Sequence, residues 1–276
     1  MDGGRRRTEI FDCRRESWMD FKEIKLERED SIQILTLNRP EQRNALSWNM
    51  RLEMIEALEN ISRDEGIRAL IITGAGDKSF CSGGNIVDMR GITPTRGRWR
   101  MGVTNKVTTL IWEMEKPVIA AVNGWVVGGA CGIVFACDVI VASEKARFML
   151  PFMRLGLVPD MGTMFFLPRL IGLPRAKELM FTTRILEMKE AERIGIVNCV
   201  IPQEILMAKA MELARAMVKY PRSALGMTKA IVNKSTHLDL QGLLELEGQA
   251  QDILFQTDDF KEGKKAFLEK REPVFK

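Results

Sequence analysis

The order of apolar and polar residues predicts a chain in which strands alternate with helices from residue 21 onward. Runs dominated by apolar residues and closed by turn residues are typical of strands buried in a parallel sheet. Strands are expected at residues 32–37, 69–73, 118–122 and 139–142. Between the first two, Ser47 is expected to be a helix N-cap. An apolar face at helical spacing follows it, made by Leu52, Ile55, Leu58 and Ile61. Strands separated by helices indicate the α/β class.

The strand pattern ends near residue 204, and the remainder of the chain predicts helices. Four are expected, at residues 204–219, 223–233, 238–256 and 259–270. Apolar positions such as Leu240, Leu243 and Leu244 have little core of their own, so we expect these helices to dock on the main domain or on another subunit. The chain is therefore divided into a polar, arginine-rich and disordered tail at 1–18, a core at 19–203 and a helical region at 204–276.

The composition is ordinary for a soluble globular enzyme, with 46% of the 276 residues apolar and 28% charged. No run approaches the roughly eighteen apolar residues of a membrane span, and the N-terminus lacks the apolar core of a secretion signal. We therefore expect a cytoplasmic protein with no membrane partner. The net charge of +4 is too small to argue for nucleic acid as a partner.

Cysteine and histidine are used in a way that disfavours metal sites. The five cysteines are odd in number and form no C-x-x-C pair, which predicts reduced and mostly buried thiols. His237 is the only histidine, so a zinc site and a serine-hydrolase triad are both disfavoured. No metal ion is expected.

Two glycine-rich segments carry candidate chemistry, 79–88 (SFCSGGNIVD) and 123–132 (NGWVVGGACG). Each follows a predicted strand and is expected to open a helix, whose N-terminus presents unpaired N–H groups with partial positive charge. Two such N–H groups aimed at one point form an oxyanion hole, which suits a thioester carbonyl that becomes an enolate. A tight turn that needs glycine for packing alone explains each segment about as well.

The same segments belong to a longer series of motifs. In chain order these are 38–46 (NRPEQRNAL), 80–86 (FCSGGNI), 116–124 (KPVIAAVNG), 128–130 (GGA), 136–138 (ACD), 157–162 (LVPDMG), 167–172 (LPRLIG), 191–197 (AERIGIV) and 262–271 (EGKKAFLEKR). Their order and spacing resemble those of the enoyl-CoA hydratase/isomerase (crotonase) superfamily, over roughly residues 21–276. The resemblance implies a spiral of repeated ββα units, followed by C-terminal helices that build trimers, often paired into hexamers. It also implies an acyl-CoA thioester as substrate, with no cofactor besides the coenzyme A that the substrate carries.

The resemblance carries over to individual site residues. The N–H groups of Gly84 and Gly129 would form the oxyanion hole. Phe267 and Lys270 match positions that approach CoA, commonly from a neighbouring subunit, although Lys270 could also be a solvated helix lysine. Asn85 replaces the usual aspartate, and asparagine can still cap a helix. The residues expected along the CoA and acyl pocket are Arg43, Asn44, Ala45, Leu46, Ser82, Gly83, Asn85, Ile86 and Phe152.

The chain departs from the family at the two catalytic glutamates of the hydratases, whose places are taken here by Gly132 and Phe152. Neither residue can activate water or supply a proton. Asp160 matches a position at which family members that shift double bonds carry an acid. An apolar setting would raise the pKa of its carboxyl group and make it a stronger base when ionised. From the residues alone, a helix N-cap explains Asp160 at least as well; with the resemblance, we expect an acid/base.

The resulting hypothesis is an enoyl-CoA isomerase in which Asp160 moves a proton from C2 to C4 while two N–H groups hold the enolate oxygen. Several alternatives stay open. One is a hydratase with relocated acids, for which Asp88, Glu113 and Glu115 are candidates, although each is expected to be a solvated helix charge. Another is dehalogenase-like hydrolysis with Asp160 as nucleophile, and a third is a catalytically silent acyl-CoA-binding subunit. The acyl chain that is bound does not follow from the sequence.

Overall fold

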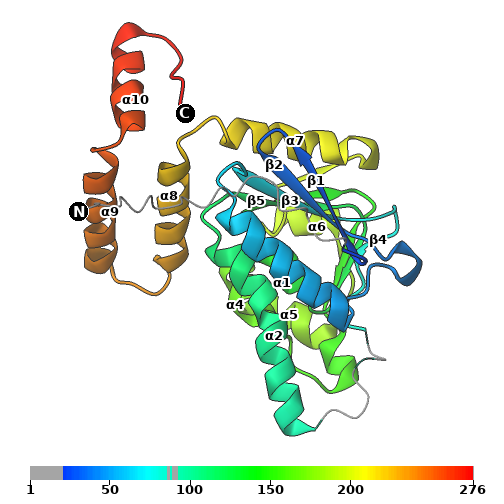
Figure 1. Cartoon of the computed structure of the whole chain (residues 1–276). Coiled ribbons are helices and arrows are strands. Elements are labelled where there is room, and N and C mark those ends of the chain that lie inside the picture. The colour runs from blue at the N-terminus through cyan, green and yellow to red at the C-terminus, as the bar shows by residue number, and fades with distance from the viewer. Residues whose placement is uncertain (1–20, 86–87, 89–92, 276) are drawn as a thin grey trace, which may run out of the picture.

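A computed structural model describes residues 21–85, 88 and 93–275 of the chain (Figure 1). The expected tail at 1–18 and the pocket residue Ile86 lie outside these residues. A large sheet has the strand order β1-β2-β3-β5-β7-β10. Its strands β1 and β2 form an antiparallel hairpin, and the neighbouring pairs from β2 to β10 are parallel. The strands are β1 (Ile24–Glu29), β2 (Ile32–Leu37), β3 (Ala69–Gly74), β5 (Val118–Val122), β7 (Val139–Ser143) and β10 (Cys199–Ile201).

A smaller sheet has the order β4-β6-β8-β9. Its members are β4 (Ser79–Cys81), β6 (Trp125–Val127), β8 (Arg147–Met149) and β9 (Leu186–Glu187). Strands β3, β5 and β7 of the large sheet are each followed by a short strand of the small sheet, and then by a helical segment. This repeated β–β–α order is the spiral that the family resemblance implied. It also places the ends of β4, β6 and β8 side by side, because these three strands are parallel.

The helices that cover the core are α1 (Trp48–Arg63), α2 (Pro94–Glu113), α3 (Ala130–Phe135), α4 (Thr163–Ile171), α5 (Leu173–Thr182) and α6 (Met188–Arg193), with short 3₁₀ turns η1 (Pro40–Gln42), η3 (Pro151–Leu155) and η4 (Gln203–Ile205). The predicted N-cap of α1 is confirmed, because Ser47 Oγ accepts from Met50 N at 2.9 Å.

The prediction of the apolar, buried face of α1 is partly wrong, since Leu52 is 44% exposed. Methionines supply much of the buried face instead, and a pattern built on leucine and isoleucine missed them.

Both faces of the large sheet are buried, which explains why its strands are so apolar. On one face Leu70 and Ile72 join the main core with α1 and α2. On the other face Ala69 and Ile71 pack against α7 (Leu206–Met217). Alternate residues of β3 therefore serve two separate apolar clusters, as the two-residue period of a strand requires. Cys81, Cys131 and Cys137 are buried free thiols, in agreement with the expectation from sequence.

The C-terminal region forms four helices near the predicted bounds: α7, α8 (Arg222–Lys234), α9 (Leu240–Leu254) and α10 (Asp258–Glu269). Helix α7 covers the sheet, whereas α8, α9 and α10 extend away from the body of the molecule (Figure 1). Helix α8 is tied to the core, because Lys229 Nζ donates to Asp138 Oδ2 at 2.8 Å and Asn233 Nδ2 donates to Trp112 O at 2.9 Å. Within the described chain, every helix is too short or too polar to cross a membrane.

Candidate active site

The second glycine turn lies where strand β6 passes into helix α3. Gly128 has a φ of +61°, in the left-handed region that favours glycine, and Gly129 is the N-cap of α3. Cys131 N donates to Gly128 O and Gly132 N donates to Gly129 O, both at 3.0 Å. The N–H of Gly129 precedes these donors, in the first turn of the helix, where backbone donors have no intrahelical acceptor. The prediction that this segment opens a helix is confirmed.

The first glycine turn follows strand β4 and is held by a bridge to the segment before α1. Gly84 forms a parallel bridge with Leu46, in which Leu46 N donates to Gly83 O at 2.8 Å and Asn85 N donates to Leu46 O at 3.1 Å. Because both bonds run through the neighbours of Gly84, its own N–H points away from Leu46. The next α-helix of the described chain, α2, begins only at Pro94. Asp88 N donates to Asn85 O at 3.1 Å, so a 3₁₀ turn follows Gly84, and the rest of the predicted helix lies outside the described residues. The Gly84 N–H remains outside the bridge.

The two glycine turns pack against each other. Gly83 has a φ of +88°, and a Cβ at this position would lie 2.6 Å from Val127 O and 3.8 Å from Gly128 Cα. Only glycine permits backbones to approach so closely. The contact brings Gly84 and Gly129 to one edge of the small sheet, where the parallel strands β4 and β6 end. The geometry is compatible with two N–H groups that serve one oxygen atom.

Asp160 lies at the same edge, in the loop before α4. A Cβ added to Gly129 would lie only 2.8 Å from Asp160 Oδ1, so the carboxylate is packed against the second turn. Asp160 Oδ1 is buried and has no hydrogen-bond partner among the described residues. Burial raises the pKa of Asp160, and the positive charge of Arg51 opposes that rise, as does the backbone N–H of Asp160 itself. A raised pKa and a free acceptor are properties of a carboxylate that takes up a proton.

The alternative role of Asp160, as a side-chain cap of the following helix, is not what the structure shows. The N-cap of α4 is Gly162, and no side chain caps that helix end. The bond that Thr163 N makes to residue 160 goes to the backbone carbonyl, at 3.0 Å. The turn is formed by backbone atoms, and the Asp160 side chain is left for another role.

The two positions of the missing glutamates are filled in different ways. At Gly132 a Cβ would lie 2.1 Å from Met161 O, so this position has no room for any side chain. The Phe152 side chain is buried, and its Cζ lies 3.9 Å from where a Cβ of Gly128 would be. The phenyl ring therefore forms an apolar wall beside the second turn. A glutamate introduced at Gly132 would collide with the backbone of Met161.

The other candidate acids lie in less suitable places. Asp88 accepts hydrogen bonds from Trp48 N and Asn85 Nδ2, each at 3.2 Å. Glu113 and Glu115 are exposed near the end of α2, as expected of solvated helix charges. His237 is also exposed, and its ring stacks on Phe165 with 5.5 Å between the ring centroids.

The two loops expected to line the CoA pocket lie side by side, since Ser82 N donates to Arg43 O at 3.0 Å. Asn44 has a structural task in addition. Its buried Nδ2 donates to Ala75 O at 3.0 Å and to Ser79 O at 2.8 Å. The pocket residues that the structure brings together in these loops are Arg43, Asn44, Ala45, Leu46, Ser82, Gly83 and Asn85. Contact between these residues and CoA stays a prediction.

Phe267 and Lys270 do not join this group within the chain. Both belong to the end of α10, which lies far from the small sheet in Figure 1, and Phe267 is 84% exposed. A role at CoA would therefore require them to act on a neighbouring subunit. That expectation stays a prediction.

One residue next to the site was missed by reasoning from sequence. Arg51 is on the buried face of α1 and only 5% exposed. Its Nη1 donates to the carbonyl groups of Leu46 and Ser47, and its charge acts on Asp160. An arginine within an apolar helix face is a signal that could have been noticed in the sequence. The residues that Arg51 contacts are set by the fold and could not have been identified from the sequence.

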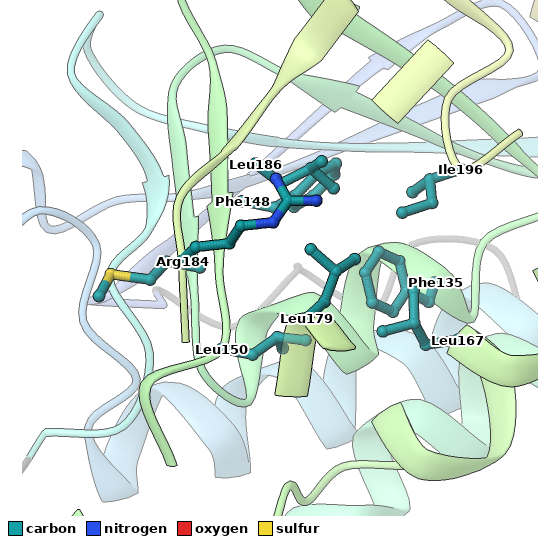
Figure 2. A pocket seen from close by; sticks show the side chains of 9 residues that line it. Phe135, Phe148, Leu150, Leu167, Leu179, Arg184, Leu186 and Ile196 are labelled. Carbon is teal, nitrogen blue, oxygen red and sulfur yellow. The ribbon is translucent and has the colours of Figure 1, made fainter. Parts of the chain in front are cut away.

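A separate apolar cavity lies at the far end of α3 (Figure 2). It adjoins Phe135, which ends that helix, whereas Gly129 stands at the helix start. Arg184 reaches over the cavity and is paired with Glu178 at 2.6 Å and with Glu190 at 2.8 Å. The remaining lining residues are Phe148, Met149, Leu150, Leu167, Leu179, Leu186 and Ile196. These side chains offer no catalytic group, so the cavity is distinct from the site at the glycine turns.

The spiral fold and the paired glycine turns define a protein of the crotonase class, and comparison with known proteins agrees. Residues 27–276 match the family model described as enoyl-CoA hydratase/isomerase. A crotonyl-CoA hydratase from Syntrophomonas wolfei is 38% identical over 257 residues, which cover 93% of this chain and 99% of that protein. A 1,2-epoxyphenylacetyl-CoA isomerase from Escherichia coli is 34% identical over 252 residues, which cover 90% of this chain and 95% of the relative.

Solved structures give the same result. A crystal structure titled putative enoyl-CoA hydratase from Streptomyces coelicolor A3(2) superimposes with a TM-score of 0.90 at 30% identity. The alignment covers 98% of this chain and 99% of that one. The chain belongs to the enoyl-CoA hydratase/isomerase family of the crotonase superfamily.

Proposed function

We propose that the protein shifts the double bond of a 3-enoyl-CoA to give the conjugated 2-enoyl-CoA. The observation that carries the proposal is the Asp160 carboxylate, which is partly buried, has an unpartnered Oδ1 and is packed against Gly129. A base next to a pair of backbone N–H groups is the minimum that enolate chemistry needs. The thioester itself accepts the electron pair, so no redox cofactor enters the scheme.

The steps balance with a single carboxylate. Asp160 takes a proton from C2, the electrons of that C–H bond form the C1–C2 double bond, and the carbonyl pair moves onto oxygen. The N–H groups of Gly84 and Gly129 stabilise this oxyanion, for which each donor contributes about 3–4 kcal/mol in comparable sites. Asp160 then returns its proton to C4, and the double bond comes to lie between C2 and C3. The carboxylate is regenerated.

Hydration is the second candidate, because the relatives from Syntrophomonas wolfei and Clostridium acetobutylicum carry the names crotonyl-CoA hydratase and short-chain-enoyl-CoA hydratase. Adding water across C2 and C3 needs a base for the water and an acid for C2. Gly132 and Phe152 supply neither, and Asp160 would have to perform both steps. This shortage of acids is why isomerisation is the preferred proposal.

Two further candidates find less support. Dehalogenase-like hydrolysis would use Asp160 as nucleophile and needs a second base, for which the exposed His237 is poorly placed beside Phe165. A silent acyl-CoA-binding subunit has no use for a carboxylate with a burial-raised pKa beside an oxyanion hole, because that arrangement reduces stability without improving binding.

The test uses the full chain with 3-enoyl-CoA and 2-enoyl-CoA esters in water enriched in ¹⁸O. Isomerisation converts the first ester to a product of unchanged mass and raises the ultraviolet absorbance of the conjugated thioester. Hydration adds one labelled oxygen to the second ester. Conjugation without ¹⁸O supports the proposal, whereas labelling at a higher rate than conjugation would establish the hydratase alternative.

We also propose that α8, α9 and α10 form the contact between subunits of a homotrimer or a dimer of trimers. Their apolar side chains are unusually exposed for a monomer, and this region has little core of its own. Size-exclusion chromatography with light scattering at micromolar concentration should give three or six copies, and a monomer would contradict the proposal. The exposed apolar residues in question are Val232, Leu240, Leu244, Ile253, Phe255, Phe260, Phe267 and Leu268.

A further inference from the structure

Arg51 carries a positive charge into the interior beneath the candidate active site. It is only 5% exposed, and its Nε is buried without a hydrogen-bond partner among the described residues. Among the residues that the structure describes, no carboxylate oxygen lies within 4.0 Å of the Arg51 guanidinium nitrogens. A buried and incompletely paired cation is costly, and helix α1 would be more stable with an apolar residue there. The presence of an arginine at this buried position therefore needs an explanation other than stability.

The contacts of Arg51 lead directly to the first glycine turn. Its Nη1 donates to Leu46 O, and the same carbonyl accepts from Asn85 N at 3.1 Å. Leu46 N holds Gly83 O at 2.8 Å. Leu46 thus fixes both neighbours of Gly84, and Arg51 fixes Leu46. The direction of the Gly84 N–H therefore depends on Arg51 through one intervening residue.

The charge of Arg51 also faces the base. After burial, Arg51 is the main influence on the pKa of Asp160, and it acts to lower it. No hydrogen bond or ion pair within 4.0 Å joins the two described side chains, so the interaction acts through space. The other charged or titratable groups that act on Arg51 are Cys81, Arg100 and Asp88. The Cys81 thiol is neutral because burial raises its pKa to about 12.

Arg100 and Asp88 have other partners. The Arg100 guanidinium lies 4.6 Å from the centroid of the Trp48 ring, and Asp88 accepts from Trp48 N. Asp160 is therefore the acid near Arg51 whose Oδ1 remains without a partner in the described chain.

We propose that Arg51 is a positioning residue for the enolate reaction, which holds the Gly84 segment in place through Leu46 and keeps a positive charge near the base. The proposal rests on the proposed role of Asp160. When Asp160 takes the C2 proton, one negative charge leaves its carboxylate and appears on the thioester oxygen at Gly84 and Gly129. Arg51 is linked to the Gly84 end of this transfer by hydrogen bonds through Leu46, and its charge acts on Asp160 at the other end. The net charge of the site does not change.

The test compares Arg51→Met and Arg51→Lys with wild type over a range of pH, using kcat/KM for 3-enoyl-CoA isomerisation. This parameter reports the ionisation of the free enzyme. Loss of the positive charge should raise the pKa of Asp160, so the acid limb of the Arg51→Met profile should move to higher pH. Its plateau should fall by roughly tenfold or more as the Gly84 N–H loses its alignment. Arg51→Lys keeps the charge and should leave the acid limb near its wild-type position.

The matched control is Arg63→Met, which removes the same charge from the exposed end of the same helix and should leave the whole profile unchanged. Circular dichroism and titration with butyryl-CoA verify that each variant folds and binds. An acid limb that stays in place in folded Arg51→Met would overturn the proposal, even if the plateau fell, because a purely structural role predicts that result. The role of Asp160 is judged separately by Asp160→Asn. An inactive Asp160→Asn with an unmoved Arg51→Met limb refutes only the role of Arg51, and a fully active Asp160→Asn refutes both.

Discussion

Asp138 and Asp160 have partly covered side chains, and burial raises the pKa of both carboxyl groups. Around Asp138 the protein supplies partners: Lys229 Nζ donates to its Oδ2 at 2.8 Å and Val118 N at 2.7 Å. Asp160 Oδ1, by contrast, has no hydrogen-bond partner in the described chain. The difference indicates that Asp138 joins α8 to the sheet, whereas Asp160 is kept available for a ligand.

The largest expected difference between these two aspartates is in turnover. Asp160→Asn preserves shape but cannot accept the C2 proton, so isomerisation should fall by roughly 10²–10⁴-fold with acyl-CoA binding largely retained. Asp138→Asn should leave the turnover of the folded protein unchanged, since Asp138 lies away from the glycine turns. Steady-state assays with 3-enoyl-CoA and titration with butyryl-CoA measure both effects. Equal losses of turnover in the two variants would contradict the assignment of different roles to Asp138 and Asp160.

The next effect concerns the turn against which Asp160 packs. Gly129→Pro removes one N–H and should raise the barrier by about 3 kcal/mol, roughly a hundredfold in rate. Any Cβ at this position also approaches Asp160 Oδ1 and Met161 Sδ, at 2.8 and 2.9 Å. Gly129→Ala is therefore the matched control, because it adds the same Cβ and retains the N–H. If both folded variants lose the same activity, crowding of Asp160 explains the loss and the N–H does not.

A smaller effect is expected in the stability of the Asp138 region. Asp138→Asn removes a charge-assisted hydrogen bond from Lys229 and should reduce the free energy of unfolding by about 1–3 kcal/mol. The double variant Asp138→Asn/Lys229→Met should recover part of this loss, because no unpaired charge then remains. Urea denaturation followed by circular dichroism measures both. A double variant less stable than the sum of the single changes would contradict the pairing.

The smallest expected effect is a gain in the stability of the folded protein. The folded-state pKa of Asp160 lies above that of an exposed aspartate, so the ionised carboxylate reduces stability at every pH above both values. Asp160→Asn should therefore be more stable than wild type at pH 7, by about 1 kcal/mol or about 2–4 °C in Tm. The gain should shrink as the pH falls toward about 4, where the unfolded chain is also protonated. Thermal melts across this range test the sign, and a loss of stability at pH 7 would contradict it.

The sequence predicted the arrangement of elements better than the roles of single residues. Apolar runs located β3 and β5 because a strand buried on both faces leaves that local trace. Asp138 and Asp160 are both aspartates, and both belong to motifs that resemble those of the family. What separates them is contact with residues distant in the chain, such as Lys229 for the one and Gly129 for the other.

Two further features were beyond local patterns for the same reason. The direction of the Gly84 N–H is set by a bridge to Leu46, a residue much earlier in the chain. Arg51 falls on a helix face that pattern rules would fill with apolar residues, and only the fold shows that it reaches Leu46 O. Contacts between residues distant in the chain determine both features, and a short stretch of sequence does not contain both partners of such a contact.

The most direct test of the central claim, that Asp160 abstracts the C2 proton, is exchange of the C2 protons of butyryl-CoA in D₂O, followed by proton NMR. This saturated ester can neither shift a double bond nor add water, so exchange reports proton abstraction and enolate stabilisation alone. Wild type and Asp138→Asn should exchange these protons at equal rates, and Asp160→Asn should be slower by roughly 10²–10⁴-fold. Exchange by folded Asp160→Asn at the wild-type rate would contradict the claim.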